Sequence, residues 1–253
     1  MRRLALGIAL LLAPVAAAAS GTEPWPPDVR AVGQYAAGVA GGDSVSFAVR
    51  TSRRLYGYRM AKTTRSASVV KAMLMVAYLN HPRIRGRPLT RSALALVTPL
   101  IRVSDNDAAD AVQAFVGNGA LRRLARRAGM RRFAAAPFWG ATQITPADQV
   151  RLFFAIDRYV VRRHRDTALR LLRSIVGPQR WGIAQARPPG WALYFKSGWV
   201  RGIENQVALL RRGRRRVSVA IFVSGLEASR GRAVQRAVAR RLLRGLDRDS
   251  IPQ

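Results

Sequence analysis

The sequence predicts an α+β protein in which one antiparallel sheet, formed by both ends of the chain, packs with terminal helices and carries an inserted all-helical lobe. Alternating apolar and polar residues, which are typical of strands, occur at 44–60 and again at 191–223. Between these stretches, apolar residues recur at helical spacing. With 49% hydrophobic residues among 253, the chain is long enough for one sizeable core.

Residues 1–19 have the pattern of a secretory signal. A basic head with Arg2 and Arg3 precedes an apolar run, and small residues suited to cleavage follow up to Ala19. The apolar run is short for a membrane span. We therefore expect a secreted, extracytoplasmic protein of the periplasm or cell wall, free of the membrane after cleavage, with one domain over 20–253.

The other elements are expected in a simple order. A helix at 29–40 ends at a pair of glycines, and strands at 44–50 and 55–60 form a hairpin. The expected helices of the middle are 68–80, 90–103, 107–115, 119–128 and 146 to about 163. The expected elements of the last part are strands at 191–196, 207–210 and 217–223 and a helix from about 230 to 246. The helical lobe is thus expected to span about 80–187.

The composition limits the partners. Cysteine is absent, which excludes disulfides and thiolate metal sites, and the only histidines, His81 and His164, are expected on the surface, so we expect no metal and no cofactor. The net charge of +31 makes nucleic acid a candidate partner, but the arginines are scattered and the signal favours export, so none is expected. The run Arg211–Arg216 is interpreted as a solvated hairpin turn. Anionic cell-wall polymers remain candidate partners, and a monomer is expected.

The first motif is Ser68-Val69-Val70-Lys71, which contains one of only three lysines. On a helix, residues three apart share a face, so Ser68 and Lys71 can meet. The apolar residues that follow imply burial, which lowers the pKa of a lysine. A neutral amine can take the proton of Ser68 and make it a nucleophile, and the backbone N–H groups of the helix start can stabilise an oxyanion.

Two further motifs place polar groups at element ends. In Ser104-Asp105-Asn106, the outer residues can face a cleft while Asp105 ties the loop; the alternative interpretation is an N-cap cluster for the helix that follows. Lys196-Ser197-Gly198 ends a strand with a cation, a hydroxyl and a glycine that permits close approach. Each motif alone is ordinary.

In this order and spacing, the three motifs match the S-x-x-K, S-D-N and K-T-G signature of class A β-lactamases and penicillin-binding proteins. The hairpin before Ser68 and the helix start I-T-P-A-D-Q also resemble the class A β-lactamase pattern, and the resemblance covers nearly the whole mature chain. It implies a β-lactamase/transpeptidase-like fold. It also implies a secreted serine hydrolase whose substrate is a β-lactam or a peptidoglycan peptide.

The same resemblance assigns roles to residues. Ser68 is implied to be the acylated nucleophile, Lys71 its base or proton relay, and Ser104 the proton shuttle to the leaving nitrogen. Asn106 is implied to hold the amide side chain of the substrate. Lys196 and Ser197 are implied to bind the carboxylate of the substrate. Ser197 stands where the family pattern has threonine. The substrate-binding set is completed by Gly198, by Trp199 as a cleft-lining aromatic and by Arg201 as a second carboxylate binder.

One part of the class A pattern is missing. The resemblance implies a glutamate before the T-P-A helix start, but residues 130–146 contain no acid. Without this base, hydrolysis of the acyl-enzyme is expected to slow by about two to four orders of magnitude. Gln143 and Glu204 are weak candidate substitutes, and Asp148 is interpreted as a structural helix-start acid. A D-Ala-D-Ala peptidase-type penicillin-binding protein, or a non-catalytic wall-binding domain of the same fold, remains an alternative.

Overall fold

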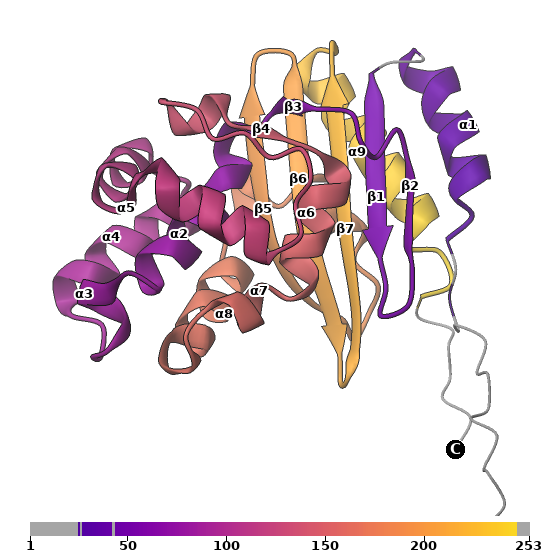
Figure 1. The fold of residues 1–253 in the computed structure, drawn as a ribbon. Coiled ribbons are helices and arrows are strands. Elements are labelled where there is room, and N and C mark those ends of the chain that lie inside the picture. Colours follow the sequence, from indigo (N-terminus) through magenta and orange to yellow (C-terminus); the bar gives the residue numbers. More distant parts are fainter. Residues whose placement is uncertain (1–24, 26, 42–43, 247–253) are drawn as a thin grey trace, which may run out of the picture.

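A computed structural model describes residues 25, 27–41 and 44–246, so the predicted signal at 1–19 lies outside the described residues. The chain forms a five-stranded antiparallel sheet of order β2-β1-β7-β6-β5 (Figure 1). The strands are β1 (Val45–Arg50), β2 (Leu55–Tyr58), β5 (Ala192–Val200), β6 (Ile203–Arg212) and β7 (Arg215–Ser224). Because β1 pairs directly with β7, the predicted sheet from both chain ends is confirmed.

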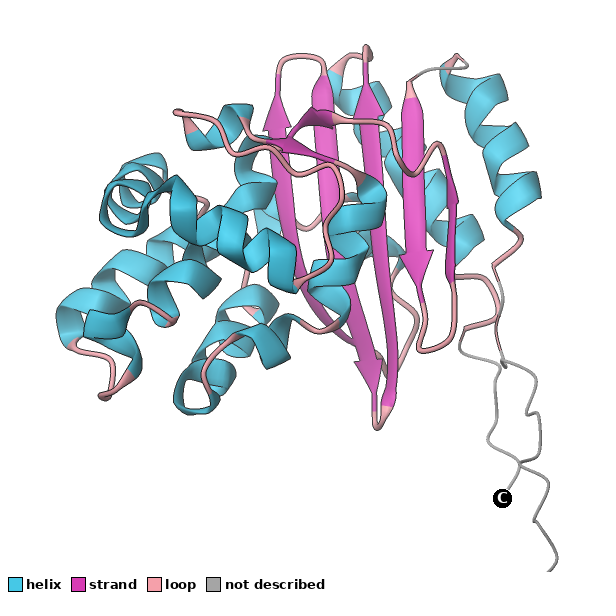
Figure 2. Ribbon diagram, in the orientation of Figure 1, coloured by secondary structure: helices cyan, strands magenta, loops and turns pink. Residues whose placement is uncertain are grey.

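Helices cover both faces of this sheet. The terminal helices α1 (Val29–Ala40) and α9 (Ala228–Leu242) pack together against one face, and α6 (Pro146–Phe154) packs against β1, β6 and β7 on the other (Figures 1 and 2). The central strands β6 and β7 are therefore buried along most of their length. Double-sided burial explains the apolar runs at 207–210 in β6 and 217–223 in β7.

The remaining helices form a lobe at one edge of the sheet, on the left in Figure 1. They are α2 (Lys71–Leu79), α3 (Pro82–Arg85), α4 (Arg91–Arg102), α5 (Asn106–Arg127), α7 (Ile156–Tyr159) and α8 (Arg165–Arg173). Helix α2 is the centre of the lobe: every one of its residues is buried, and it contacts α4, α5 and α8. Its position fixes Lys71, its first residue, at the boundary between lobe and sheet.

Several predicted bounds differ from the structure. The helix expected at 68–80 begins as a 3₁₀ turn, η1 (Ala67–Val70), and the helices expected at 107–115 and 119–128 join as α5 across a break at Gly117, whose φ is 67°. The single helix expected from 146 is wrong, because it ends at Ala155 and resumes only as the short α7. Helix α8 was not predicted, although its buried Ala168, Leu171 and Leu172 have helical spacing.

Two smaller features bear on the site. Strands β3 (Thr64–Arg65) and β4 (Gln143–Ile144) pair with each other and tie the chain before Ser68 to the loop that lacks the expected glutamate. The arginine run at 211–216 includes the turn between β6 and β7, as predicted. Within the described part of the chain, no helix has the length and apolar character needed to cross a bilayer.

Candidate active site

Ser68 lies in η1, at the entry to helix α2, and is half-buried. The preceding residue, Ala67, has a left-handed backbone with φ of 44°, which is costly for a residue with a side chain. In the described chain no acceptor is found for the Ser68 N–H, as expected in the first turn of a helix. Strand β5 comes so close that a Cβ on Gly198 would lie 2.6 Å from the nitrogen of Ser68, so only glycine fits there.

Lys71 is fully buried one turn after Ser68 and points toward the loop before α5. Its Nζ donates to the Ser104 carbonyl oxygen at 2.6 Å, to the Asp105 carbonyl oxygen at 3.0 Å and to Asn106 Oδ1 at 2.7 Å. It also lies 4.3 Å from the centre of the Trp139 ring. The first two motifs therefore meet at one ammonium group.

The protonation of Lys71 is shifted by its surroundings. Burial lowers the pKa of Lys71 from 10.5 to about 8, although the carboxylates of Asp105 and Asp110 act in the opposite direction. A lysine that loses its proton near neutral pH can act as a base. The predicted effect of burial on the pKa of this lysine is present.

Ser104 joins the second motif to the third. Its backbone is left-handed, with φ of 61°, and its hydroxyl accepts a hydrogen bond from Lys196 Nζ at 2.9 Å. Lys196 is fully buried, and burial together with the charge of Lys71 lowers the pKa of Lys196 well below its usual value. The strained backbone at Ser104 thus presents its carbonyl to one lysine and its hydroxyl to the other.

Asp105 and Asn106 have separate tasks. The Asp105 carboxylate caps helix α5 by accepting from the Ala108 N–H at 2.8 Å, so the N-cap interpretation of this motif is correct for Asp105. Asn106, the first residue of α5, holds Lys71 with its Oδ1 and lines a small pocket in front of Ser68. The capping and cleft interpretations therefore apply to neighbouring residues of one motif.

This nucleophile pocket encloses about 190 Å³. Of the predicted residues, Ser68, Asn106 and Trp199 border it. The rest of its lining consists of Arg65, Ala67, Phe138, Trp139, Gly140, Ala141 and Val200. No acidic residue lines it. The pocket therefore joins the nucleophile to an amide group, a cation and aromatic surfaces.

Trp139 occupies the loop in which the glutamate was expected, and contacts with α5 fix its position. Its indole Nε1 donates to Asp110 Oδ1 at 2.7 Å, and its backbone N–H donates to Gln113 Oε1 at 3.0 Å. The start of the loop is held by Asp148, whose carboxylate accepts from the N–H groups of Arg131 and Arg132 at 2.9 Å. The structural role predicted for Asp148 is consistent with this geometry.

Of three predicted substrate-binding residues, Trp199 lines the nucleophile pocket as predicted, whereas Ser197 and Arg201 do not. The Ser197 hydroxyl is buried and donates to the Gln179 carbonyl oxygen at 3.4 Å, so it is not presented to the nucleophile pocket. Trp199 lines the pocket, but its ring packs edge-on against Trp181, at 6.4 Å between ring centres. Arg201 lies in the exposed β5–β6 turn and does not line the pocket.

The two substitutes considered for the missing base also lie elsewhere. Glu204 faces Trp199 across the β5–β6 pair and is bound by Arg232 Nε at 3.3 Å, and burial raises the pKa of Glu204. The Gln143 side chain donates to the Ala141 carbonyl oxygen at 3.1 Å. Neither residue lines the nucleophile pocket.

Sequence reasoning missed the roles of Arg65, Asp110 and Trp139. Arg65 had one available signal, since it lies three residues before Ser68 in the pairing strand β3. The contact between Asp110 and Trp139 joins residues 29 apart, and nothing local in the sequence indicates it. The described residues contain no group of three or more His, Cys, Asp or Glu that could hold a metal. His164, expected at the surface, is instead buried, with Nε2 at 3.3 Å from the Ile84 carbonyl oxygen.

Solved structures of low sequence identity share this fold. A β-lactamase from Sphaerobacter thermophilus has a TM-score of 0.77 and 20% identity, with 90% of this chain and 99% of that chain covered. A β-lactamase from Xanthomonas campestris has a TM-score of 0.75 and 18% identity, covering 86% and 97%. PBP-A has a TM-score of 0.72 and 16% identity, covering 89% and 98%. Among curated proteins, none matched the chain.

A family model described as the beta-lactamase enzyme family matches residues 84–246, which is more than half of the chain. The matched range includes Ser104–Asn106 and Lys196–Gly198 but begins after Lys71. Ser68 is placed in the site by the lining of the nucleophile pocket, and Lys71 by its hydrogen bonds to 104–106. The fold, the three converging motifs and this match agree. The chain therefore belongs to the beta-lactamase enzyme family and has the fold of its class A-like serine hydrolases.

Proposed function

We propose that this protein is a serine hydrolase that is acylated at Ser68 by β-lactams or related cell-wall peptides and releases the acyl group slowly. One observation carries the proposal: Lys71 and Lys196 converge on Ser104, one through its carbonyl oxygen and the other through its hydroxyl. A domain that only binds has no physical need for two buried lysines around one serine, because burying amines is costly. Buried lysines that contact a serine hydroxyl or its neighbours are suited to take up and return its proton.

In the proposed acylation, Lys71 takes the proton of Ser68, and Ser104 gives a proton to the leaving nitrogen. The Ser68 oxygen attacks the carbonyl carbon of the lactam, its proton passes to neutral Lys71, and the C–N bond breaks as the ester forms. The leaving nitrogen takes a proton from the Ser104 hydroxyl, which Lys196, in its protonated form, replaces through the 2.9 Å contact. The free N–H of Ser68 is suited to stabilise the oxyanion, because it has no other acceptor in the described chain.

Substrate binding uses the edge of the nucleophile pocket. Asn106 offers its amide to the side-chain amide of the substrate, since its Oδ1 is held by Lys71 and its nitrogen remains available. Arg65 lines the same pocket and is exposed, which makes it the best-placed cation for the substrate carboxylate beside Lys196. We assign this role to Arg65 in preference to Arg201, which lies in the outer turn.

Slow deacylation is supported by the absence of any acid from the lining of the nucleophile pocket. Trp139 stands against Lys71 on the side from which a loop acid would act, and the Asp110 carboxylate is engaged by the indole N–H. Glu204 is bound to Arg232 and lies outside the lining. Water that enters the acylated site would therefore find no carboxylate to take its proton, which costs about two to four orders of magnitude in rate.

A second candidate function is a peptidase-type penicillin-binding protein. It is favoured by the missing base and by the likeness to PBP-A, because a solved structure of a PBP-A mutant is described as an acyl-enzyme complex with penicillin G. In that function, a D-alanyl-D-alanine peptide would acylate Ser68 and a second amine or water would release it. The signal pattern at 1–19 supports action outside the cytoplasm in either case.

The test is intact-mass measurement of the mature protein after brief and long exposure to a penicillin and a cephalosporin, beside Ser68→Ala. We expect one adduct on the wild type, persisting for hours, and none on Ser68→Ala. Parallel incubation with a D-alanyl-D-alanine peptide would separate the two functions, because only the peptidase would release free alanine. No adduct with any of the three compounds would refute acylation and favour a non-catalytic wall-binding role.

A further inference from the structure

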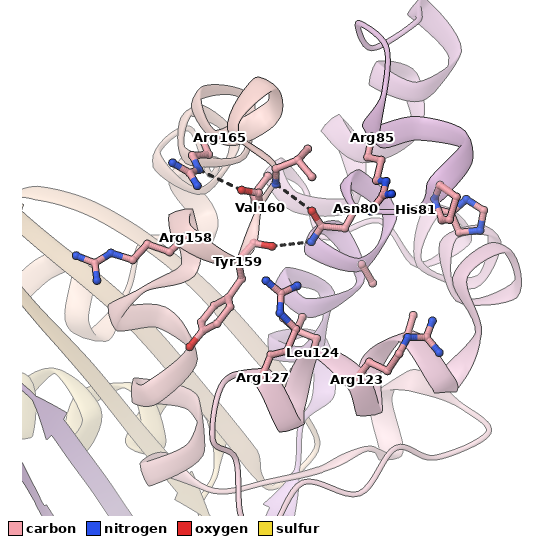
Figure 3. A pocket seen from close by; sticks show the side chains of 14 residues that line it. Asn80, His81, Arg85, Arg123, Leu124, Arg127, Arg158, Tyr159, Val160 and Arg165 are labelled. Atoms are coloured by element: carbon pink, nitrogen blue, oxygen red, sulfur yellow. Dashed lines mark hydrogen bonds between the residues drawn. The ribbon is translucent and has the colours of Figure 1, made fainter.

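A second and larger cavity lies at the other end of helix α2 from Ser68. It encloses about 440 Å³ between the end of α2, the second half of α5 and the segment that follows α7 (Figure 3). Its basic lining residues are His81, Arg85, Arg123, Arg127, Arg158 and Arg165, and none of its lining residues is acidic. We call this cavity the arginine pocket. Neither the active-site motifs nor the proposed function uses it.

The walls of the arginine pocket are built rigidly. Asn80, the residue that ends α2, donates to the Tyr159 carbonyl oxygen at 2.6 Å and accepts from the Val161 N–H at 2.9 Å. Arg165 Nε donates to the Val160 carbonyl oxygen at 3.1 Å. These bonds appear as dashed lines in Figure 3. They occupy the nearby carbonyl oxygens, so these oxygens do not compete for the guanidinium groups inside.

Three arginines surround the hollow. Figure 3 shows Arg85, Arg123 and Arg127 on different sides of it, whereas Arg158 points away. Arg127 lies over the Tyr159 ring, 5.8 Å from its centre. In the described chain, Arg151, Arg216 and Arg232 are paired with carboxylates. Arg85, Arg123 and Arg127 have no acidic partner there, a property that they share with other surface arginines of the chain.

Such an arrangement selects for anions with several oxygens. Guanidinium groups bind phosphate oxygens in pairs of parallel hydrogen bonds, and a concave site with partly apolar walls strengthens the attraction. Ala77 and Leu124 supply apolar lining here. An uncompensated cluster of this kind repels itself in the empty protein, and a bound polyanion would remove that repulsion.

We propose that the arginine pocket binds a phosphate-bearing anion, supplied either by an anionic wall polymer or by a small phosphorylated molecule. The volume exceeds what one phosphate ion fills, so a chain of several phosphate groups can enter the pocket. This binding is independent of acylation at Ser68.

The test is isothermal titration calorimetry with inorganic tripolyphosphate at fixed ionic strength. We expect one strong site on the wild type and on Ser68→Ala. The triple variant Arg85→Gln, Arg123→Gln, Arg127→Gln should lose at least about tenfold in affinity, because it removes three charge-assisted contacts. Because Ser68→Ala cannot be acylated, equal tripolyphosphate affinity of Ser68→Ala and wild type would show that anion binding does not depend on the proposed hydrolase activity.

A matched control is available on the same two helices. Arg83, Arg122 and Arg126 are exposed, carry the same charge and do not line the pocket. Changing these three to glutamine should alter the affinity by less than about twofold, since only a screened long-range field is lost. Equal losses in both triple variants would overturn the proposal and attribute binding to the diffuse charge of +31.

A second variant blocks the pocket without changing charge. Ala77→Leu adds three heavy atoms to its lining and should abolish the strong site while the acylation rate of Ser68 reports that the fold persists. Retained binding in a folded Ala77→Leu protein would count against this location. Competition with poly(glycerol phosphate) identifies the source: displacement that strengthens with chain length supports a wall polymer, and equal displacement by short oligomers supports a small phosphorylated ligand.

Discussion

The proposed acylation of Ser68 is expected to depend on pH through the protonation of Lys71. With a pKa of about 8, roughly one-tenth of the amine is neutral at pH 7 and about nine-tenths at pH 9. The acylation rate of Ser68 should therefore rise about tenfold between pH 7 and pH 9 and level off above that. A lysine with its ordinary pKa of 10.5 would instead give a rise of about a hundredfold with no plateau in this range.

The cause of the shift can be tested by one substitution. Asp110→Asn keeps an oxygen for the Trp139 indole but removes a carboxylate that raises the pKa of Lys71. Burial then acts with less opposition, so the midpoint of the pH profile should move to lower pH. The matched control is Asp166→Asn, an equal loss of charge in the first turn of helix α8, which should leave the midpoint unchanged.

The assay is quenched-flow intact mass of the Ser68 adduct with one penicillin, from pH 6 to pH 10. Spontaneous hydrolysis of the drug is subtracted by running Ser68→Ala in parallel. A rate that stays flat across this range, or one that still climbs steeply at pH 10, would refute the assignment of Lys71 as the base with a lowered pKa.

Three other changes have defined outcomes. Gly198→Ala would place a Cβ 2.6 Å from the Ser68 nitrogen, so it should displace η1 and slow acylation about a hundredfold. In the control Gly86→Ala the added Cβ meets no neighbouring atom, and the acylation rate, measured by adduct mass, should not change. Trp139→Phe replaces the indole with a smaller phenyl ring and loses the hydrogen bond to Asp110, so urea denaturation should show an unfolding free energy lower by at least about 1–2 kcal/mol. Lys196→Met should stop acylation yet raise Tm at pH 7. The folded state lowers the pKa of Lys196, so below the ordinary lysine pKa the unfolded chain binds the proton more strongly and the buried amine destabilises the fold. An unchanged or lower Tm would contradict this.

The sheet and its helices could be predicted because their signals are local. The alternation at 44–60 and the apolar runs after Trp191 indicate the strands, and the pairing of β1 with β7 confirms the predicted single sheet from both chain ends. The convergence of the three motifs was also predictable, through a known signature. The side chains then confirmed it with the contacts of Lys71 and Lys196 to Ser104.

The remaining features depend on contacts between distant segments. Trp139 is placed by Asp110 and Gln113 on another element, and no periodicity in its loop indicates that. The Ser197 hydroxyl follows the strand alternation and turns to the Gln179 carbonyl oxygen, although its motif suggests substrate binding. The break at Ala155 is likewise not indicated by the sequence, because no glycine or proline stands near it.

Because arginine is so strongly preferred in this chain, the positions that keep a lysine are informative about function. The chain has 44 basic residues, yet two of its three lysines, Lys71 and Lys196, are fully buried around Ser104. Arginine cannot lose its proton in a protein, whereas a buried lysine can, and both of these have lowered pKa values. Substitution by arginine would keep the charge at these two positions and remove the chemistry. In this sequence, therefore, a buried lysine is a stronger sign of proton transfer than it would be in a chain of average composition.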